Sequence, residues 1–359
     1  MTSLAVYQRR LKALQQQLNN NQAILVSKPT DIFYLVNFPQ LAPSEREAFL
    51  LVSPKKTALF HHRFSPTLSQ QSWLKTIPTT DLDKVAENIG DNVSELIIDP
   101  HTLSVAEQRE LSDHWSGKLA DLPPQWLWEL RVTKDQTESK SLRKAAKIAQ
   151  QVMAQAIKQL KPGMTEKEVV SLILQLMLKA GSEKPAFPII VAFGAAGALP
   201  HYQPKNVKLK KEMPVLIDLG ATVDGYCSDM TRTVWLGQRP SEEFLKVEKI
   251  VRNAYQQTVK LLKQSKKNLT AKELDDAARE VISEAGFAKE FIHTTGHGLG
   301  LEIHEPPSLS WNNEQAIKPH MAITIEPGIY LPGKFGYRYE NTWLTTKTGA
   351  VNLTANSNE

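Results

Sequence analysis

Residues 165–181 read TEKEVVSLILQLMLKAG, and residues 270–286 read TAKELDDAAREVISEAG. Both stretches open with Thr-x-x-Glu, the spacing of a capping box, in which the hydroxyl and the carboxylate satisfy the first free amides of a helix. Both also close with Ala-Gly, and glycine is typical of the residue just past a helix C-terminus. The sequence therefore predicts two helices with the same spacing from cap to glycine.

The same order of features surrounds both stretches. A longer helical pattern precedes each one, and a histidine follows it, His201 in the first copy and His304 in the second. Each copy then supplies two carboxylates on predicted strands: Asp218 and Asp229, then Glu326 and Glu340. We expect two α+β halves related by a pseudo-two-fold axis, with the carboxylates meeting between them. The alternative is two unrelated helical hairpins that share common capping chemistry.

The first pair of carboxylates lies in residues 215–237, VLIDLGATVDGYCSDMTRTVWLG, where Asp-Gly is a hairpin turn signal. If Val223 pairs with Tyr226, then Asp218 lies opposite Thr231. Asp229 is two residues away, and side chains alternate with period two along a strand. The two carboxylates therefore share one face and can converge on one site. A salt-bridged structural pair is the alternative.

The remaining candidates lie in TTGHGLGLEIHE (294–305), ITIEPGIY (323–330) and YRYEN (337–341). They add His297, Glu326 and Glu340, while alternation along a strand places Arg338 on the face of Glu340. Buried carboxylates are costly unless they are paired or bound to a cation. Four of them with one histidine form the oxygen-rich set expected of a two-metal hydrolytic centre. Taken singly, each could instead be a structural histidine or a solvated carboxylate.

Bulk properties exclude several classes of protein. The chain has 359 residues, 41% hydrophobic and 23% charged, with a net charge of +5 and a pI near 9.0, so neither composition nor charge indicates nucleic-acid binding. The N-terminus lacks a signal-peptide pattern, and no apolar run is long enough for a membrane span. The single cysteine, Cys227, cannot form an intramolecular disulfide, which favours a cytoplasmic protein with a packed thiol.

The first third of the chain alternates strand and helix patterns. QAILVS, AFLLVS, TALFHH and ELIIDP read as short strands, and SVAEQRELSDHW reads as a helix capped by Ser104. Pro123-Pro124 then interrupts the pattern of strands and helices. We expect an α/β domain over residues 1–124 and a second domain over residues 125–359.

Taken together, these motifs resemble the proline-specific metallopeptidases of the pita-bread fold, aminopeptidase P and prolidase, whose relatives include methionine aminopeptidase and creatinase. The matching stretches are AFPIIVAFGAAGALPH (186–201), VLIDLGATVDGYCSDMTRT (215–233), TTGHGLGLEIHE, IEPGIY and YRYEN. DIFYLVNF (31–38) and EREAFLLV (45–52) are similar to the creatinase-type N-terminal domain. The resemblance implies an α/β N-terminal domain followed by an α+β pita-bread catalytic domain with an internal pseudo-two-fold repeat.

The resemblance also implies roles for individual residues. Asp218 would bind one divalent metal, His297 with Glu326 would bind another, and Asp229 and Glu340 would bridge both. A hydroxide between the metals would attack the carbonyl before proline, with Glu326 taking the proton. His201 and His304 would act catalytically on the substrate side by stabilising the tetrahedral intermediate and the leaving proline nitrogen, and His293 would contact the substrate. Arg338 is a further candidate for substrate binding, and could instead orient the Glu340 carboxylate or form a plain cross-strand ion pair. Oxygen-rich ligation favours Mn²⁺ or Co²⁺ over Zn²⁺. The implied substrate is a short proline-containing peptide, and the implied assembly is a homodimer.

Two positions depart from the family pattern. Asn341 follows Glu340 where the family usually has aspartate, and Ser308 stands where many dipeptidases have an arginine for the product carboxylate. Aminopeptidase P and prolidase therefore both remain open. A metal-free creatinase-like amidinohydrolase or a non-catalytic peptide-binding module would require replaced ligand positions, and none is replaced. The N-terminal domain argues against a methionine aminopeptidase.

Overall fold

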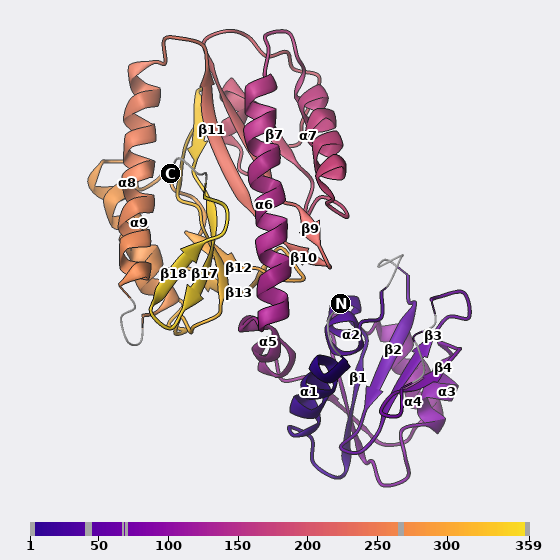
Figure 1. Cartoon of the computed structure of the whole chain (residues 1–359). Coiled ribbons are helices and arrows are strands. Elements are labelled where there is room, and N and C mark those ends of the chain that lie inside the picture. The colour runs from indigo at the N-terminus through magenta and orange to yellow at the C-terminus, as the bar shows by residue number, and fades with distance from the viewer. Residues whose placement is uncertain (1–3, 40–44, 67, 69–70, 265–268, 356–359) are drawn as a thin grey trace. The chain divides into compact units, whose positions relative to one another are not determined.

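The computed structural model describes residues 4–39, 45–66, 68, 71–264 and 269–355. The chain forms two compact units, Met1–Arg131 and Val132–Glu359 (Figure 1). Helix α5 (Gln125–Val132) begins directly after Pro124 and lies almost entirely within the first unit. The sequence-based boundary at Pro124 stays a prediction about where the two domains separate.

The N-terminal unit is built on a six-stranded sheet in the order β4-β3-β2-β1-β5-β6. Its strands are β1 (Gln22–Val26), β2 (Ala48–Val52), β3 (Thr57–His61), β4 (Lys75–Ile77), β5 (Glu95–Ile98) and β6 (Lys118–Asp121). Its helices are α1 (Leu4–Gln15), α2 (Pro29–Val36), α3 (Leu82–Glu87) and α4 (Val105–His114). The four predicted strands are confirmed, and Ser104 caps α4 as predicted. Leu25, Phe49 and Phe60 belong to the apolar core of this unit.

The first half of the second unit, which we call the C-terminal unit, carries helices and then a three-stranded sheet in the order β11-β8-β7. Its elements are α6 (Gln136–Gln159), α7 (Glu166–Ala180), β7 (Ile190–Phe193), η1 (Gly194–Ala198), β8 (Met213–Leu219), β9 (Thr222–Val223), β10 (Tyr226–Cys227) and β11 (Met230–Leu236). Helix α6 packs against α7. Val152, Ile173 and Ile217 are among the buried side chains that join these helices to the sheet.

The second half repeats this plan with a five-stranded sheet in the order β13-β12-β14-β17-β18 and a separate β15-β16 ribbon. Its elements are α8 (Glu242–Lys263), α9 (Ala271–Glu284), β12 (Gly296–Gly298), β13 (Glu305–Leu309), β14 (Ala322–Ile325), β15 (Gly328–Leu331), β16 (Phe335–Arg338), β17 (Asn341–Thr346) and β18 (Gly349–Asn352). Helix α8 packs against α9, as α6 packs against α7, and the long helices flank the strands (Figure 1).

The repeat predicted from the sequence is present in the backbone. Both capping boxes form, and the glycines that follow the two helices have φ of 89° and 86°, the left-handed conformation that favours glycine. Each capping threonine also makes an isolated bridge to a later segment of its own half, Thr165 to Lys208 and Thr270 to Ala316. The two halves therefore match in their helix caps, in their helix packing and in the bridge from the capping threonine to a later segment.

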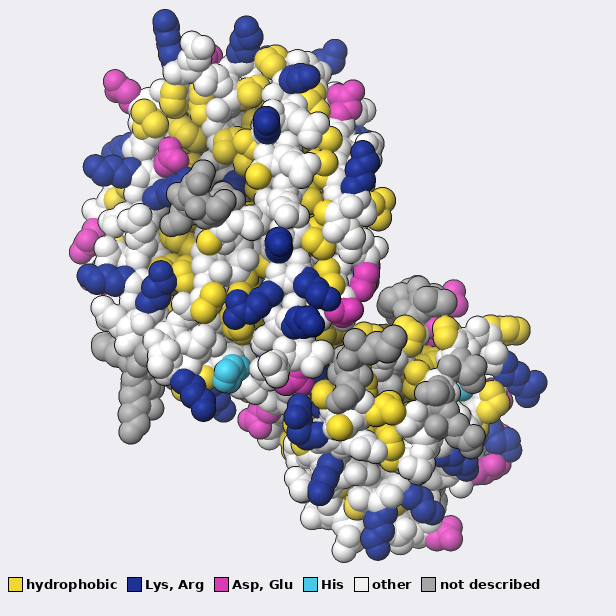
Figure 2. Space-filling view, in the orientation of Figure 1, with side chains coloured by type: hydrophobic (Ala, Val, Ile, Leu, Met, Phe, Trp, Pro, Cys, Tyr) yellow, Lys and Arg dark blue, Asp and Glu magenta, His cyan; other side chains and the backbone are white. Residues whose placement is uncertain are grey.

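Surface chemistry is mixed on the face shown in Figure 2, where lysine and arginine side chains are scattered among hydrophobic and acidic ones on each unit. Among the described helices, none combines the length and the apolar character needed to cross a bilayer. Cys227 is a buried free thiol, as predicted, and burial raises its pKa to about 12.

Candidate metal centre

The β8–β11 hairpin has the register that the sequence predicts. Val223 pairs with Tyr226, and Asp218 pairs with Thr231. Asp218 and Asp229 are only 8% and 5% exposed, so one hairpin brings two carboxylates into the interior of the C-terminal unit. This burial is costly for ionised groups, and their partners decide what the site can do.

Three of the candidate ligands converge closely. Oxygen or nitrogen atoms of Asp229, His297 and Glu340 all lie within 4.8 Å of one another, a grouping that could hold a metal ion. They come from the hairpin of the first half, from β12 and from the residue just before β17 in the second half. The centre is therefore assembled across the internal repeat.

His297 is oriented so that one ring nitrogen faces the carboxylates. Its Nδ1 lies 3.0 Å from the Gly298 carbonyl, which can only accept, so Nδ1 carries the proton. Its Nε2 is 3.6 Å from Asp229 Oδ2 and 3.3 Å from Glu326 Oε1. Burial lowers the pKa of His297, which keeps Nε2 unprotonated and able to bind a cation.

Glu326 directly follows β14 and is held by a hydroxyl two residues earlier. Thr324 Oγ1 donates to Glu326 Oε1 at 3.2 Å and accepts from the His297 amide at 3.0 Å. Burial raises the pKa of Glu326 to about 7, and the Asp218 charge acts in the same direction, while Arg338 opposes the rise. A carboxyl with this pKa can exchange a proton near neutral pH.

Asp218 is oriented by an arginine from the other half. Arg338 donates from Nη2 to Asp218 Oδ2 at 2.6 Å, from Nε to Thr231 Oγ1 at 3.0 Å and from Nη1 to the Tyr330 hydroxyl at 2.8 Å. Thr231 Oγ1 in turn donates to Glu340 Oε2 at 2.6 Å. Alternation along the strand suggested Glu340 as the neighbour of Arg338, whereas its ion pair is with Asp218.

The centre gathers several carboxyl groups whose oxygens lack partners among the described residues. Asp218 Oδ1, Asp229 Oδ1 and Glu340 Oε1 are buried and have no hydrogen-bond partner among the described residues. Burial raises the pKa values of Asp229 and Glu340 well above the usual range, and neighbouring carboxylates raise them further. Unpartnered oxygens aimed into one buried space, beside an unprotonated imidazole nitrogen, fit the ligand set of divalent cations.

The three other candidate histidines surround this cluster in different ways. His304 and His201 are exposed, and the His304 ring lies 4.4 Å, centroid to centroid, from that of His297 in an edge-on arrangement. Both ring nitrogens of His293 already have partners, Nδ1 with the Thr294 carbonyl at 2.7 Å and Nε2 with the Tyr330 hydroxyl at 2.8 Å. Burial lowers the pKa of His293 to about 3, so its ring is neutral.

Comparison with known proteins now decides the family. Residues 140–347 match Metallopeptidase family M24, and residues 10–133 match the Creatinase/Prolidase N-terminal domain. The chain belongs to metallopeptidase family M24. The predicted resemblance and the predicted fold are thereby confirmed.

Similar proteins align with nearly the whole chain. A Xaa-Pro dipeptidase of Pyrococcus furiosus is 34% identical over 98% of this chain and 99% of its own. Among solved structures, a Xaa-Pro dipeptidase from Bacillus anthracis has a TM-score of 0.89 at 28% identity, covering 98% of this chain and 99% of that one. An X-Pro aminopeptidase from Thermotoga maritima has a TM-score of 0.83 at 29% identity, covering 96% and 98%.

Asn341, the departure from the family pattern beside Glu340, sits in a polar network of its own in this M24 metallopeptidase. Its Oδ1 accepts from Arg232 at 2.9 Å and from Thr354 at 3.0 Å, while its Nδ2 donates to Tyr255 at 2.8 Å. Arg232 also donates to the backbone carbonyl of Glu340 at 2.6 Å. Arg232 thus links the Asn341 side chain to the backbone carbonyl of Glu340.

Sequence reasoning singled out Arg338 but not the other residues that orient the candidate ligands. The Thr231 hydroxyl donates a hydrogen bond to Glu340, and the Thr324 hydroxyl donates one to Glu326. The Tyr330 hydroxyl forms hydrogen bonds with both His293 and Arg338. A signal was available for both threonines, because Thr324 lies two residues before Glu326 on one strand and Thr231 lies opposite Asp218 in the hairpin. No spacing in the sequence indicated a role for Tyr330.

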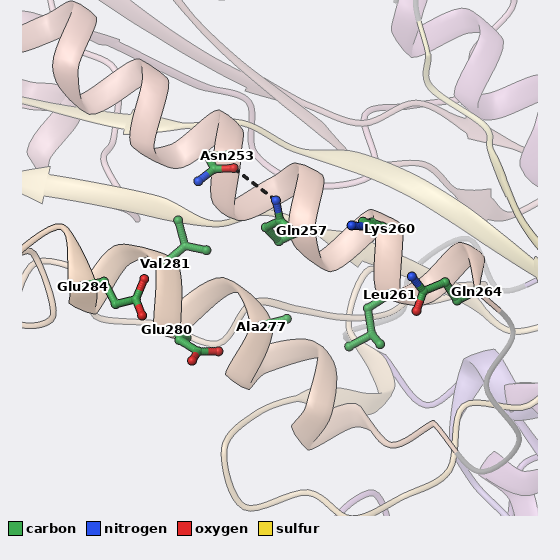
Figure 3. Close-up of a pocket in the computed structure, with 9 residues that line it drawn as sticks. All are labelled: Asn253, Gln257, Lys260, Leu261, Gln264, Ala277, Glu280, Val281 and Glu284. Carbon is green, nitrogen blue, oxygen red and sulfur yellow. Dashed lines mark hydrogen bonds between the residues drawn. The ribbon is translucent and has the colours of Figure 1, made fainter.

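Two hollows lie away from this cluster. One of about 520 Å³ lies between α8 and α9, where Gln257 donates to Asn253 at 3.4 Å (Figure 3). The other, of about 860 Å³, lies in the N-terminal unit between the β2–β3 turn and the residues after α3. The candidate ligands and substrate-side residues line neither hollow, so these volumes do not mark the M24 site.

Proposed function

We propose that this M24 metallopeptidase hydrolyses the peptide bond before proline in short peptides. One observation carries the proposal: buried carboxylate oxygens without partners among the described residues converge with an unprotonated histidine nitrogen. Support also comes from relatives named Xaa-Pro dipeptidase that align with nearly the whole chain at 33–34% identity.

The proposed cation ligands follow the family resemblance. Asp218 would hold one divalent cation, His297 and Glu326 would hold a second, and Asp229 with Glu340 would serve both. When bound, such cations activate water and polarise the scissile carbonyl as Lewis acids. The oxygen-rich donor set supports Mn²⁺ or Co²⁺ over Zn²⁺ as the native metal.

Glu326 is the proposed general base. Burial raises the pKa of Glu326 to about 7 in the metal-free protein, and a bound cation would lower it, which favours the carboxylate form that can accept a proton. Thr324 would hold the carboxylate through Oε1 and so fix the direction of the proton transfer. The ion pair between Arg338 and Asp218 supports a positioning role for Arg338 beside any contact with substrate.

The exposed histidines would serve the substrate. Burial and the nearby His297 and His201 lower the pKa of His304, so its imidazole is neutral and can donate an N–H to a developing oxyanion. We assign His201 to the same side of the reaction, next to the leaving proline nitrogen. His293 would contact the peptide through ring carbons, because both of its nitrogens are engaged.

The test is a peptide assay on the purified protein loaded with Mn²⁺. Ala-Pro and Ala-Pro-Ala are each incubated with and without EDTA, and released alanine is measured. Asp229→Asn, treated identically, controls for contaminating peptidases. EDTA-sensitive release from Ala-Pro alone assigns a dipeptidase despite Ser308, and release from Ala-Pro-Ala assigns an aminopeptidase. Stoichiometric bound metal without release from either peptide would refute the proposal.

We further propose a cytoplasmic homodimer with manganese as its native cation. The single buried thiol of Cys227 supports a reducing compartment. The homodimer follows from the family resemblance. Light scattering after size exclusion measures the mass of the particle, and elemental analysis of protein purified without added metal measures its cations. A monomer of 40.3 kDa would contradict the dimer.

A further inference from the structure

Two buried carboxylates outside the metal centre hold the segments that carry its histidines. Asp275 lies on α9 and Glu166 begins α7, and neither exposes any surface. Neither belongs to the candidate ligand set or to the substrate side. Because a buried carboxylate is costly without partners, the groups that satisfy each one identify what it is there to hold.

Asp275 is satisfied by the chain between His293 and His297. Its Oδ1 accepts from the Thr295 amide at 3.0 Å and from the Thr295 hydroxyl at 2.8 Å. Thr295 is fully buried, and its carbonyl accepts from the Glu326 amide at 2.8 Å. A single residue thus connects Asp275 to the segments of two proposed ligands, His297 and Glu326.

Arg279, one turn further along α9, completes this contact. It donates two hydrogen bonds to the Asp275 carboxylate, from Nε to Oδ2 at 2.9 Å and from Nη2 to Oδ1 at 3.0 Å. The remaining donor capacity goes to the Phe291 carbonyl at 3.2 Å and the His293 carbonyl at 3.0 Å. The pair therefore fixes the main chain from residue 291 to residue 295.

Glu166 makes a corresponding contact in the first half. Its Oε1 accepts from the Phe193 amide at 2.9 Å, and its Oε2 accepts from the Tyr202 hydroxyl at 2.9 Å and the Lys205 amide at 2.8 Å. Phe193 and Lys205 are the two ends of the loop that carries His201. None of the proposed metal ligands lies in that loop.

The two contacts are not copies made by the repeat. Counting from the capping threonines, Ala271 stands where Glu166 would be expected, and Val170 stands where Asp275 would be expected. Each half has placed its own carboxylate at a different helical position. The role of each carboxylate is therefore set by the histidine segment beside it and not by a shared demand of the helix pair.

We propose that Asp275 and Glu166 are positioning residues with separable tasks. Asp275, with Arg279, sets the metal-ligating segment through Thr295 as well as the His293 main chain. Glu166 sets only the substrate-side loop of His201. The metal assignment rests on the proposed function, while the division of labour between the two carboxylates can be tested without peptide hydrolysis.

The experiment compares two isosteric variants, Asp275→Asn and Glu166→Gln, in the full-length protein. Arg279 and Thr295 both donate hydrogen bonds to Asp275. An asparagine amide at position 275 would face one of them with its own N–H groups, and that hydrogen bond would be lost. Mn²⁺ affinity is measured calorimetrically on metal-free protein, and kcat and KM are measured with Ala-Pro or Ala-Pro-Ala. We expect Asp275→Asn to weaken Mn²⁺ affinity about 10–100-fold, as loss of a partner that orients ligands does. We expect Glu166→Gln to leave that affinity within about twofold of wild type and to lower kcat/KM about 10–100-fold, because it misplaces the loop that carries His201.

Equal Mn²⁺ affinity in Asp275→Asn and wild type, or equal weakening in both variants, would overturn the proposal. Circular dichroism and thermal melting establish that each variant is folded. Thr295→Val is the second variant, because it removes one hydroxyl donor to Asp275 and keeps the side-chain shape. It should weaken Mn²⁺ affinity in the same direction as Asp275→Asn but less. If wild type binds Mn²⁺ yet cleaves neither peptide, the proposed function fails, and the affinity comparison still decides this inference.

Discussion

The two halves of the C-terminal unit have the same backbone plan and different charge compensation. In the first half, Asp218 on β8 forms an ion pair of 2.6 Å with Arg338. In the second half, Glu326 follows the corresponding strand, β14, and faces a neutral imidazole at 3.3 Å. Burial raises the pKa of Glu326 to about 7. Duplication of a fold thus leaves the electrostatics of each copy free to differ.

The difference has a structural source, because each half supplies a side chain that contacts a carboxylate of the other half. Arg338 belongs to β16 in the second half but neutralises Asp218 in the first. Thr231 belongs to β11 in the first half but donates to Glu340 in the second. The two sides of the site are unequal, and the following predictions probe that inequality from the largest expected effect to the smallest.

Asp229→Asn should abolish turnover. Asp229 lies on the hairpin of the first half, and its carboxylate oxygen lies within 4.8 Å of ligand atoms of His297 and Glu340 in the second half. Removing its charge leaves neither proposed cation position with a full ligand set. Peptidase activity should fall below detection and the Mn²⁺ content should drop, while circular dichroism stays unchanged. Activity near that of wild type would remove Asp229 from the centre.

Glu326→Gln should change how the stability of the metal-free protein depends on pH. Burial raises the pKa of Glu326 from 4.5 to about 7, so the folded state binds a proton that the unfolded state releases. The stabilisation from this group is complete below pH 4.5 and is lost as pH rises through about 7. Glutamine does not titrate.

The variant should therefore gain stability over wild type between about pH 5 and about pH 8, by the order of 3 kcal/mol. Urea unfolding in EDTA at both pH values measures the gain. Asp276→Asn, which removes a carboxylate whose side chain is 48% exposed on α9, is the matched control and should show no such trend. A stability difference independent of pH would contradict the prediction.

Arg338→Met should lower kcat/KM about 10–100-fold, in the range found when a partner of a metal ligand is lost. It removes the ion pair with Asp218 and the bonds to Thr231 and Tyr330. Arg338→Lys keeps the charge and can reach fewer of these partners, so it should restore part of the activity. If lysine restores all of it, charge alone is needed and the geometry of the three bonds is not.

Thr231→Val and Thr324→Val compare the halves through a single hydroxyl each. A hydrogen bond to a charged group contributes about 1.5–3 kcal/mol, so each change should weaken Mn²⁺ affinity about tenfold or more. Thr231 should show the larger effect, because its bond to Glu340 is 2.6 Å and it also accepts from Arg338. The Thr324 bond to Glu326 is 3.2 Å. Serine at either position should restore affinity, and failure to do so would point to packing.

Asn341→Asp should have the smallest effect. The side chain contacts Arg232, Thr354 and Tyr255, and it reaches Glu340 only through the main chain. The added charge would meet Arg232, so kcat/KM should stay within about twofold and the melting temperature should not fall. A tenfold change in activity would show that this network controls the Glu340 carboxylate after all.

Much of this arrangement could be predicted from the sequence, because it depends on local spacing. The capping boxes at Thr165 and Thr270, the Asp-Gly hairpin and its register follow from short-range rules. The pairing of Arg338 with Asp218 could not be predicted, since the two lie far apart in the chain and alternation favoured Glu340 as the neighbour. Asp275 and Glu166 were hidden for the same reason, because a helical carboxylate reads as solvated until its distant partners are known.

The crowded carboxyl groups of the metal centre also bear on how much of the protein is present in a cell. Burying several ionisable carboxyl groups together opposes folding, and a ligand that binds only the folded state stabilises it by about 2.7 kcal/mol at one hundred times its dissociation constant. If the proposed cations bind, the supply of metal sets the fraction of chains open to proteases. Metal starvation would then lower the abundance of this peptidase as well as its turnover.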